Sequence, residues 1–225
     1  MPGRNIPLVN NQIYHVLNRG VASQPIFLNK KDYQRALETV FYYQNEDLPL
    51  SYSTFLKLSQ PKREETLKKL KGKGNFLIEI IAFCLMPNHF HLLLKQVQDN
   101  GISIFMSNLS NSYTRYFNIS HKRIGPLFQG KFKAIRIETE EQLLHGSRYI
   151  HLNPYTSYVI KTLKELETYP YSSFAEYLNP QKTDHCQKEI ILDSFKSSLD
   201  YKRFVFDQAD YQRKLEETKH LILEE

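Results

Sequence analysis

The sequence has few cysteines, and the two that it has lie far apart. Only Cys84 and Cys186 occur in 225 residues, and neither belongs to a Cys-x-x-Cys pair. Two cysteines cannot build the disulfide framework of a small secreted domain, and no cysteine pair is present to complete a closed zinc site. These absences fit a protein of a reducing cytoplasm.

The sequence also lacks a long uninterrupted apolar run. Its first residues, MPGRNIPLVNN, contain no apolar core of the signal-peptide type. The apolar segment 76–94 is broken by a glutamate, a Pro-Asn pair and two histidines. No internal repeat or low-complexity segment is present. We therefore expect no membrane anchor and a cytoplasmic, nucleoid-associated location.

Acidic residues are fewer than basic ones, with 24 Asp and Glu against 30 Lys and Arg, a net charge of +6. Residues 1–184 carry 23 basic and 15 acidic residues, or +8, whereas the remainder carries 7 and 9. A basic region suits a polyanionic partner such as nucleic acid, although solubility alone would also explain a modest positive charge. The ordinary hydrophobic content of 41% indicates a folded globular protein.

Two histidines stand at the head of an apolar run in the stretch MPNHFHLLL. In a strand, the alternation of side chains sends His89 and His91 to one face, and Phe90 and the alternate leucines to the other. Two imidazoles on one face can hold one metal ion. A wet strand end is an equally good interpretation of this pattern on its own.

Periodicity predicts the remaining elements. Strands are expected at 12–17, 76–85, 89–94 and 132–137, with a tight turn between the second and third. Helices are expected after Asn29 and Gly101 and between Thr139 and Asn153, where Pro154 should end the last one. The Lys-rich segment 47–75 is expected to form an exposed insertion.

The loop from His121 to Arg136 is basic and contains no acidic residue. Its cations are Lys122, Arg123, Lys131, Lys133 and Arg136, with Phe128 and Phe132 between them. Basic groups neutralise phosphates and aromatic rings stack on unpaired bases, so this loop indicates single-stranded nucleic acid. A basic surface loop with two buried phenylalanines is the alternative.

Tyr149 differs from the other tyrosines of the helical segments. Tyr113 and Tyr116 share an apolar stripe and are expected in the core, whereas Tyr149 falls on the polar flank of its helix. Asn153 follows one turn later. An amphipathic tyrosine at a helix boundary is the alternative.

Five segments together resemble the REP-associated tyrosine transposases, a group of single-tyrosine His-hydrophobic-His endonucleases. They are YHV with Arg19-Gly20, MPNHFHLLL at 86–94, GPLFQGKFK at 125–133, RYIHLNP at 148–154 and YPYSSF at 169–174. Their order matches over about residues 10–180. The chain departs from the pattern in its longer insertion and in Lys131, where arginine is common; lysine offers a point charge rather than a fork.

The resemblance implies an α+β fold, namely a ferredoxin-like antiparallel sheet with helices mainly on one face. It implies a nuclease domain at 1–180, containing the insertion, followed by a helical C-terminal extension at 181–225. It also assigns roles: Tyr149 as nucleophile, and His89, His91 and Asn153 as ligands of Mg or Mn. The expected nucleic-acid contacts are Arg19, Lys122, Arg123, Phe128, Lys131 and Lys133.

The implied activity is DNA nicking and strand transfer near a palindromic hairpin, through a covalent 5′-phosphotyrosine. A tyrosine with the ordinary pKa of ~10 needs help, which a divalent cation on the phosphate supplies. Two alternatives stay open: a domesticated hairpin-binding protein that no longer cuts, and a metallohydrolase of small substrates. Monomer and dimer are both compatible with the sequence.

Overall fold

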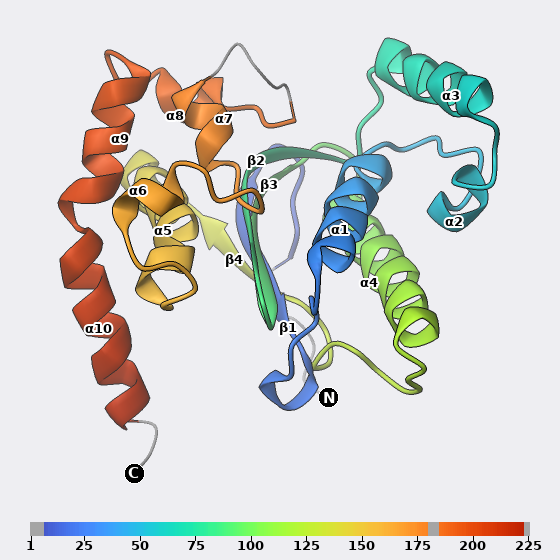
Figure 1. Cartoon of the computed structure of the whole chain (residues 1–225). Helices are drawn as coiled ribbons and strands as arrows, with labels where there is room; N and C mark the ends of the chain where they lie inside the picture. Colours follow the sequence, from blue (N-terminus) through green and yellow to red (C-terminus); the bar gives the residue numbers. More distant parts are fainter. Residues whose placement is uncertain (1–6, 180–184, 223–225) are drawn as a thin grey trace. The chain divides into compact units, whose positions relative to one another are not determined.

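The computed structural model describes residues 7–179 and 185–222, and their side chains except at 71–73 and 216–222 (Figure 1). The strands are β1 (Ile13–Arg19), β2 (Ile78–Met86), β3 (His89–Gln96) and β4 (Lys133–Ile137). The longer helices are α1 (Lys30–Tyr43), α3 (Gln60–Lys73), α4 (Gly101–Ser120), α5 (Glu140–Thr156), α9 (Ser198–Asp207) and α10 (Ala209–Ile222). Shorter ones are η1 (Val21–Ser23), α2 (Tyr52–Phe55), α6 (Leu163–Leu166), α7 (Phe174–Leu178) and α8 (Glu189–Leu192). No helix in the described part of the chain combines the length and the apolar character needed to cross a bilayer.

The four strands form one antiparallel sheet in the order β2-β3-β1-β4. With α1 between β1 and β2, and α4 between β3 and β4, the chain follows the β-α-β-β-α-β order of ferredoxin-like folds. The predicted α+β class and antiparallel sheet are confirmed. The four predicted strands are all present, and β2 and β3 are joined by the expected turn at Pro87 and Asn88.

Contacts within the chain define two compact units. The first comprises residues 1–79, 87–89 and 94–136, and the second comprises 80–86, 90–93 and 137–225. Strands β2 and β3 contribute residues to both. The predicted boundary at residue 180 is not a boundary between these units, and the assignment of 1–180 as a nuclease domain stays a prediction.

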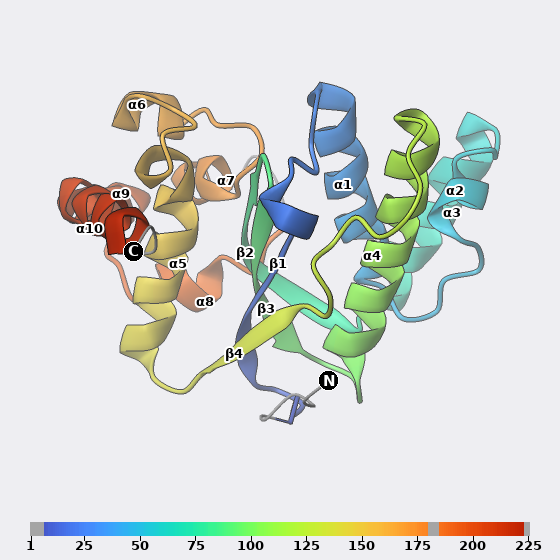
Figure 2. The same ribbon diagram turned by 90° about the horizontal axis from the view of Figure 1, so that it is seen from below.

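In the first unit, α1 and α4 pack side by side (Figures 1 and 2). Asn29 caps α1 as predicted, because its side chain accepts hydrogen bonds from two backbone N–H groups of the first turn. Tyr113 of α4 is buried, lies 5.4 Å from Phe27 between ring centroids, and donates a 2.6 Å hydrogen bond to the carbonyl of Ile26. Its predicted place in the core is confirmed.

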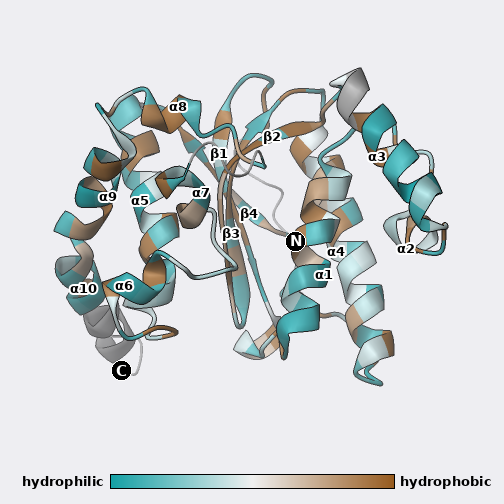
Figure 3. Cartoon of the chain, turned by 45° about the horizontal axis from the view of Figure 1, so that its top comes forward, coloured by the Kyte–Doolittle hydropathy of each residue, from teal (hydrophilic) through white to brown (hydrophobic). Residues whose placement is uncertain are grey.

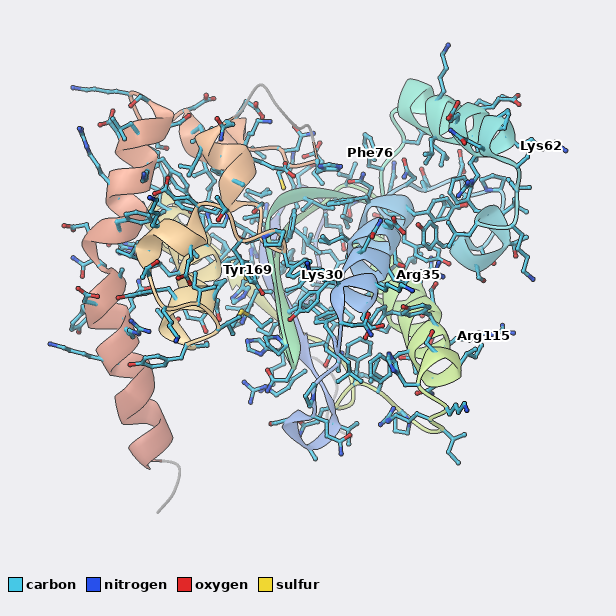
Figure 4. The ribbon with its side chains drawn as sticks, in the orientation of Figure 1. Lys30, Arg35, Lys62, Phe76, Arg115 and Tyr169 are labelled. Atoms are coloured by element: carbon cyan, nitrogen blue, oxygen red, sulfur yellow. The ribbon has the colours of Figure 1, made fainter. Side chains whose placement is uncertain are left out.

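The insertion contains helices α2 and α3. Most of α3 is hydrophilic (Figure 3), and Lys62 extends from it into solvent (Figure 4). Gly74 ends α3 at a φ of +62°, a left-handed conformation that glycine adopts without a steric penalty. The helix thus ends near this glycine, and the assignment of the segment as an insertion stays a prediction.

In the second unit, α5 packs against α9 and α10 (Figures 1 and 2). Thr139 caps α5 as predicted, but the helix does not end at Asn153: it continues through Pro154 to Thr156. Proline removes one hydrogen bond from the preceding turn. The final turn persists because the N–H groups of Ser157 and Val159 donate to the carbonyls of Asn153 and Pro154.

Both cysteines lie in the second unit and are buried. Cys84 of β2 has no exposed surface and Cys186 only 3%. Burial raises the pKa of both thiols. For Cys186, the nearby Glu176 carboxylate adds to this rise in pKa. Both thiols are therefore held in the protonated, unreactive form.

Candidate active site

Tyr149 and His91 lie beside each other in the second unit. Their rings meet edge to face, with 5.5 Å between centroids and 85° between planes. His91 is only 4% exposed on β3, and Tyr149 is half-buried on α5. The structure thus brings the candidate nucleophile next to one of the candidate metal ligands.

Asn153 lies one helical turn after Tyr149. Its Nδ2 donates a 2.8 Å hydrogen bond to the backbone carbonyl of Tyr149, and its side chain is 3% exposed. Since Nδ2 is turned to the helix, Oδ1 is the atom that this amide can offer to a cation. A neutral oxygen ligand of this kind suits Mg or Mn.

His89 stands two residues before His91 on β3 and belongs to the first unit. Its Nδ1 lies 2.6 Å from Oδ1 of Asn88, while Nδ2 of Asn88 donates to the carbonyl of Ser23 at 3.1 Å. Because an acceptor faces Nδ1, the neutral tautomer that fits this contact carries its proton on Nδ1. Nε2 then holds the lone pair that a metal ligand requires.

The donor set fits the expected type of metal. Among the side chains that the structure describes, those of residues 7–70, 74–179 and 185–215, no three His, Cys, Asp or Glu gather into one cluster. The closed ligand shell of a structural zinc site is therefore absent from that part of the chain. The donors that the second unit contributes, an imidazole from His91 and an amide oxygen from Asn153, would leave open positions for phosphate and water on a divalent cation.

The predicted nucleic-acid contacts all belong to the first unit. Arg19, Lys122, Lys131 and Lys133 are exposed. The carbonyl of Arg19 accepts a 2.8 Å hydrogen bond from the N–H of Gln129, which brings Arg19 beside the basic loop. Four of the six predicted contacts are therefore exposed cations.

Arg123 differs from the other cations of the loop, because its guanidinium bonds to the end of α4 and to the loop backbone. Nη1 donates to Oδ1 of Asn118 at 3.1 Å, and Nη2 donates to the carbonyl of Pro126 at 2.7 Å. Asn118 in turn donates to the carbonyl of Gly125. In this arrangement Arg123 shapes the loop, and its predicted contact with nucleic acid stays a prediction.

Phe128 is buried, with 8% of its side chain exposed, and its ring centroid lies 6.4 Å from that of Tyr113. Its ring therefore packs in the core, as the alternative of a surface loop over buried phenylalanines expects. The predicted contact of Phe128 with nucleic acid stays a prediction. Phe132 remains half-exposed.

Sequence reasoning missed a group of buried polar residues behind Tyr149. His151 has no exposed surface; its Nδ1 lies 2.7 Å from the hydroxyl of Tyr201, and its Nε2 lies 2.8 Å from the hydroxyl of Ser173. Burial lowers the pKa of His151 to about 3. The position of His151 between Tyr149 and Asn153 was visible in the sequence, but no periodicity indicated its distant partners.

Comparisons with known proteins find a family model that matches part of the chain and a curated relative. The family model described as "Transposase IS200 like" matches residues 57–153, which include all four predicted catalytic and metal-binding residues. A curated protein of Haemophilus influenzae named "Putative REP-associated tyrosine transposase" is 27% identical over 110 residues. That alignment covers 44% of this chain, and the chain spans only 61% of the length of this relative.

A solved structure shares the fold. It is titled "Structure of the REP associates tyrosine transposase bound to a REP hairpin", and it matches with a TM-score of 0.54 and 14% identity over 82% of this chain and 89% of that one. The family model and the curated relative thus confirm the resemblance of this chain to the REP-associated tyrosine transposases, and the solved structure shows that the fold is shared.

Proposed function

We propose that this protein nicks single-stranded DNA beside a hairpin and transfers the cut strand through a covalent 5′-phosphotyrosine at Tyr149. The observation that carries the proposal is the edge-to-face contact of Tyr149 with His91. A tyrosine used only for packing would not need a histidine of the His-x-His pair at its ring. One that attacks a phosphate must have the phosphate-binding groups beside it.

The chemistry conserves the energy of the phosphodiester. The Tyr149 oxygen forms a bond to phosphorus and gives up its proton, while the bond to the 3′ oxygen breaks and that oxygen gains a proton. A 3′ hydroxyl can reverse the step and rejoin strands. Tyr149 therefore serves in both cleavage and transfer.

The proposed ligands of the divalent cation are His89, His91 and Asn153. When bound, a divalent cation withdraws charge from the phosphate oxygens. The protein orients the proposed ligands. Asn88 accepts from Nδ1 of His89, so that Nε2 is the nitrogen proposed to bind the metal, and Asn153 presents Oδ1 from the turn after Tyr149. Mn²⁺ accepts both imidazole and amide ligands, so it is the ion for a first test.

The substrate is proposed to be DNA that combines a hairpin with an adjoining single strand. The solved relative is bound to a REP hairpin. Here the exposed Arg19, Lys122, Lys131 and Lys133 supply cations for phosphate contacts. These contacts give affinity rather than chemistry, so binding and cleavage are separable.

The test uses a hairpin oligonucleotide with a labelled single-stranded flank and Mn²⁺. We expect a covalent protein–DNA adduct that is absent in Tyr149→Phe and present in Tyr158→Phe, a control that removes a more exposed hydroxyl just beyond α5. An adduct that persists in Tyr149→Phe would overturn the proposal. Tight hairpin binding without an adduct would favour the non-cleaving alternative.

A further inference from the structure

We infer that a buried chain of hydrogen bonds centred on His151 sets the rotation of α5 about its axis and so aims Tyr149 at His91. This inference rests on the proposed function, in which Tyr149 is the nucleophile. It makes His151, Ser173 and Tyr201 positioning residues, since none of them touches the reacting atoms.

The chain of hydrogen bonds begins at β2 and ends within α5. The N–H of Phe83 donates to the hydroxyl of Ser173 at 2.9 Å, and that hydroxyl lies 2.8 Å from Nε2 of His151. Nδ1 of His151 lies 2.7 Å from the hydroxyl of Tyr201, which donates to Ser147 at 3.1 Å. All five residues belong to the second unit. These hydrogen bonds therefore connect α5 to β2 and to α9 within one compact unit.

The shorter bonds of this chain share one direction. With the proton of a neutral imidazole on Nδ1, His151 accepts from Ser173 at Nε2 and donates to Tyr201. Tyr201 then donates to Ser147, whose hydroxyl donates to the carbonyl of Leu144 at 2.8 Å. The Ser173 hydroxyl also lies 3.3 Å from the carbonyl of Phe83, a longer contact. A neutral imidazole with its proton on Nδ1 satisfies every one of the shorter bonds. Such a fully satisfied network is rigid, because any displacement leaves a buried polar group without its partner.

His151 and Tyr149 lie on opposite sides of α5. Residues two apart in a helix are separated by about 200° around its axis. A hydroxyl about 8 Å from the axis moves by roughly 1.4 Å when the helix turns by about 10°. Misplacing a reacting group by about 1 Å costs on the order of 100-fold in rate, so the rotation of α5 matters to the chemistry.

Other residues on the same side of α5 as His151 also contact the C-terminal helices. Arg148 places its guanidinium 4.4 Å from the ring centroid of Phe204, and Tyr155 donates a 2.8 Å hydrogen bond to Asp210. Residues of α9 and α10 thus contact α5 on both sides of His151 in the sequence. The C-terminal helices lie beyond residues 57–153, the part that the family model matches, yet they hold the helix of the nucleophile.

The experiment compares two substitutions that each remove one buried tyrosine hydroxyl. Tyr201→Phe removes the hydroxyl that bonds to Nδ1 of His151 and so interrupts the series of hydrogen bonds. Tyr169→Phe removes a 2.9 Å hydrogen bond to the carbonyl of Leu85 in the same unit, a bond in which α5 takes no part (Figure 4 labels Tyr169). Three quantities are measured for each full-length protein: hairpin affinity, the rate of adduct formation, and the ¹⁹F resonance of a fluorotyrosine placed at position 149.

We expect Tyr201→Phe to slow adduct formation by about 10- to 100-fold while hairpin affinity stays within about twofold. The ¹⁹F resonance should shift as the ring moves relative to His91. Tyr169→Phe should change neither the rate nor the resonance. Ser173→Ala removes the hydrogen bond at Nε2 of His151 and should have the same effect. It replaces Tyr201→Phe if that variant does not fold.

A Tyr201→Phe protein with normal rate and resonance would overturn the inference and leave His151 an ordinary core residue. Failure of the proposed function gives a different result. If the unmodified protein forms no adduct, the nuclease proposal fails, whereas the ¹⁹F shift in Tyr201→Phe still decides whether the chain of hydrogen bonds positions Tyr149.

Discussion

The rings of Tyr149 on α5 and His91 on β3 meet almost at a right angle, with 85° between their planes. The two side chains come from positions 58 residues apart in the sequence. Their contact makes separate tests of ring packing and of metal binding possible, because a phenylalanine can replace either ring.

Replacing His91 with phenylalanine keeps an aromatic ring against Tyr149 and removes both nitrogens. We expect the Mn²⁺-dependent rate of adduct formation to fall by more than about 100-fold, because a ligand is lost. Hairpin affinity should change by less than about twofold, since phosphate contacts dominate it. Gel assays of adduct and of binding check both values, and an unchanged rate would exclude His91 as a ligand.

We expect the free energy of unfolding to decrease as the pH is lowered, because His151 is buried as a neutral group. Its pKa is lowered to about 3 in the folded state by burial, against the usual 6.5. The unfolded chain therefore takes up a proton first, so this contribution to stability is complete above pH 6.5 and is lost as the pH falls toward 3. At about 1.4 kcal/mol per pH unit, the loss between pH 6.5 and 4 is about 3 kcal/mol.

Urea unfolding at pH 7 and pH 4 measures this loss in the unmodified protein and in His151→Gln, which cannot titrate at this position. The variant should be less stable at pH 7 but should lose about 3 kcal/mol less between the two pH values. Equal losses in both proteins would show that His151 is not buried as a neutral group.

Two neighbouring cations of the basic loop should behave differently. Lys122 is exposed, so Lys122→Ala should reduce the slope of log affinity against log salt by about 1. Arg123 bonds to Asn118 and Pro126, so Arg123→Ala should loosen the loop and increase its cleavage by trypsin at Lys122. If Arg123→Ala lowered the salt slope without loosening the loop, Arg123 would be a direct phosphate contact.

Replacing each of two glycines with alanine should change the stability of the protein in opposite directions. A Cβ at Gly101 would lie 2.1 Å from the carbonyl oxygen of Leu77, so Gly101→Ala must displace backbone and should cost about 1–3 kcal/mol. A Cβ at Gly146 within α5 would meet only the Cδ1 atom of Ile137 at 3.9 Å. Gly146→Ala should therefore stabilise the protein by about 0.5–1 kcal/mol. Thermal unfolding measures both, and equal effects would contradict this packing.

The elements with strong local signals could be predicted from the sequence. The caps at Asn29 and Thr139 work through side chains that bond to N–H groups within three residues. The apolar run of β2 and the alternation at the start of β3 predict strands, because both signals depend only on neighbouring residues. Local signals of this kind also separated Tyr113, a core residue, from Tyr149.

Features that depend on distant partners could not be predicted. The partners of His151 lie 22 and 50 residues away, and no period of a helix or strand encodes them. The end of α5 was misplaced because the bonds that hold its last turn outweigh the bias of Pro154. The choice between a stacking and a buried Phe128 could not be made from the sequence, because the charge of its neighbours says nothing about what packs beneath them.

The burial of both cysteines makes the chain well suited to site-directed probes. With the thiols of Cys84 and Cys186 enclosed, a cysteine introduced at an exposed position becomes the preferred target of a maleimide dye or spin label in the folded protein. No native residue has to be removed first. Pairs of labels on α5 and α9 would then follow, in real time, whether the helix that carries Tyr149 turns when DNA binds.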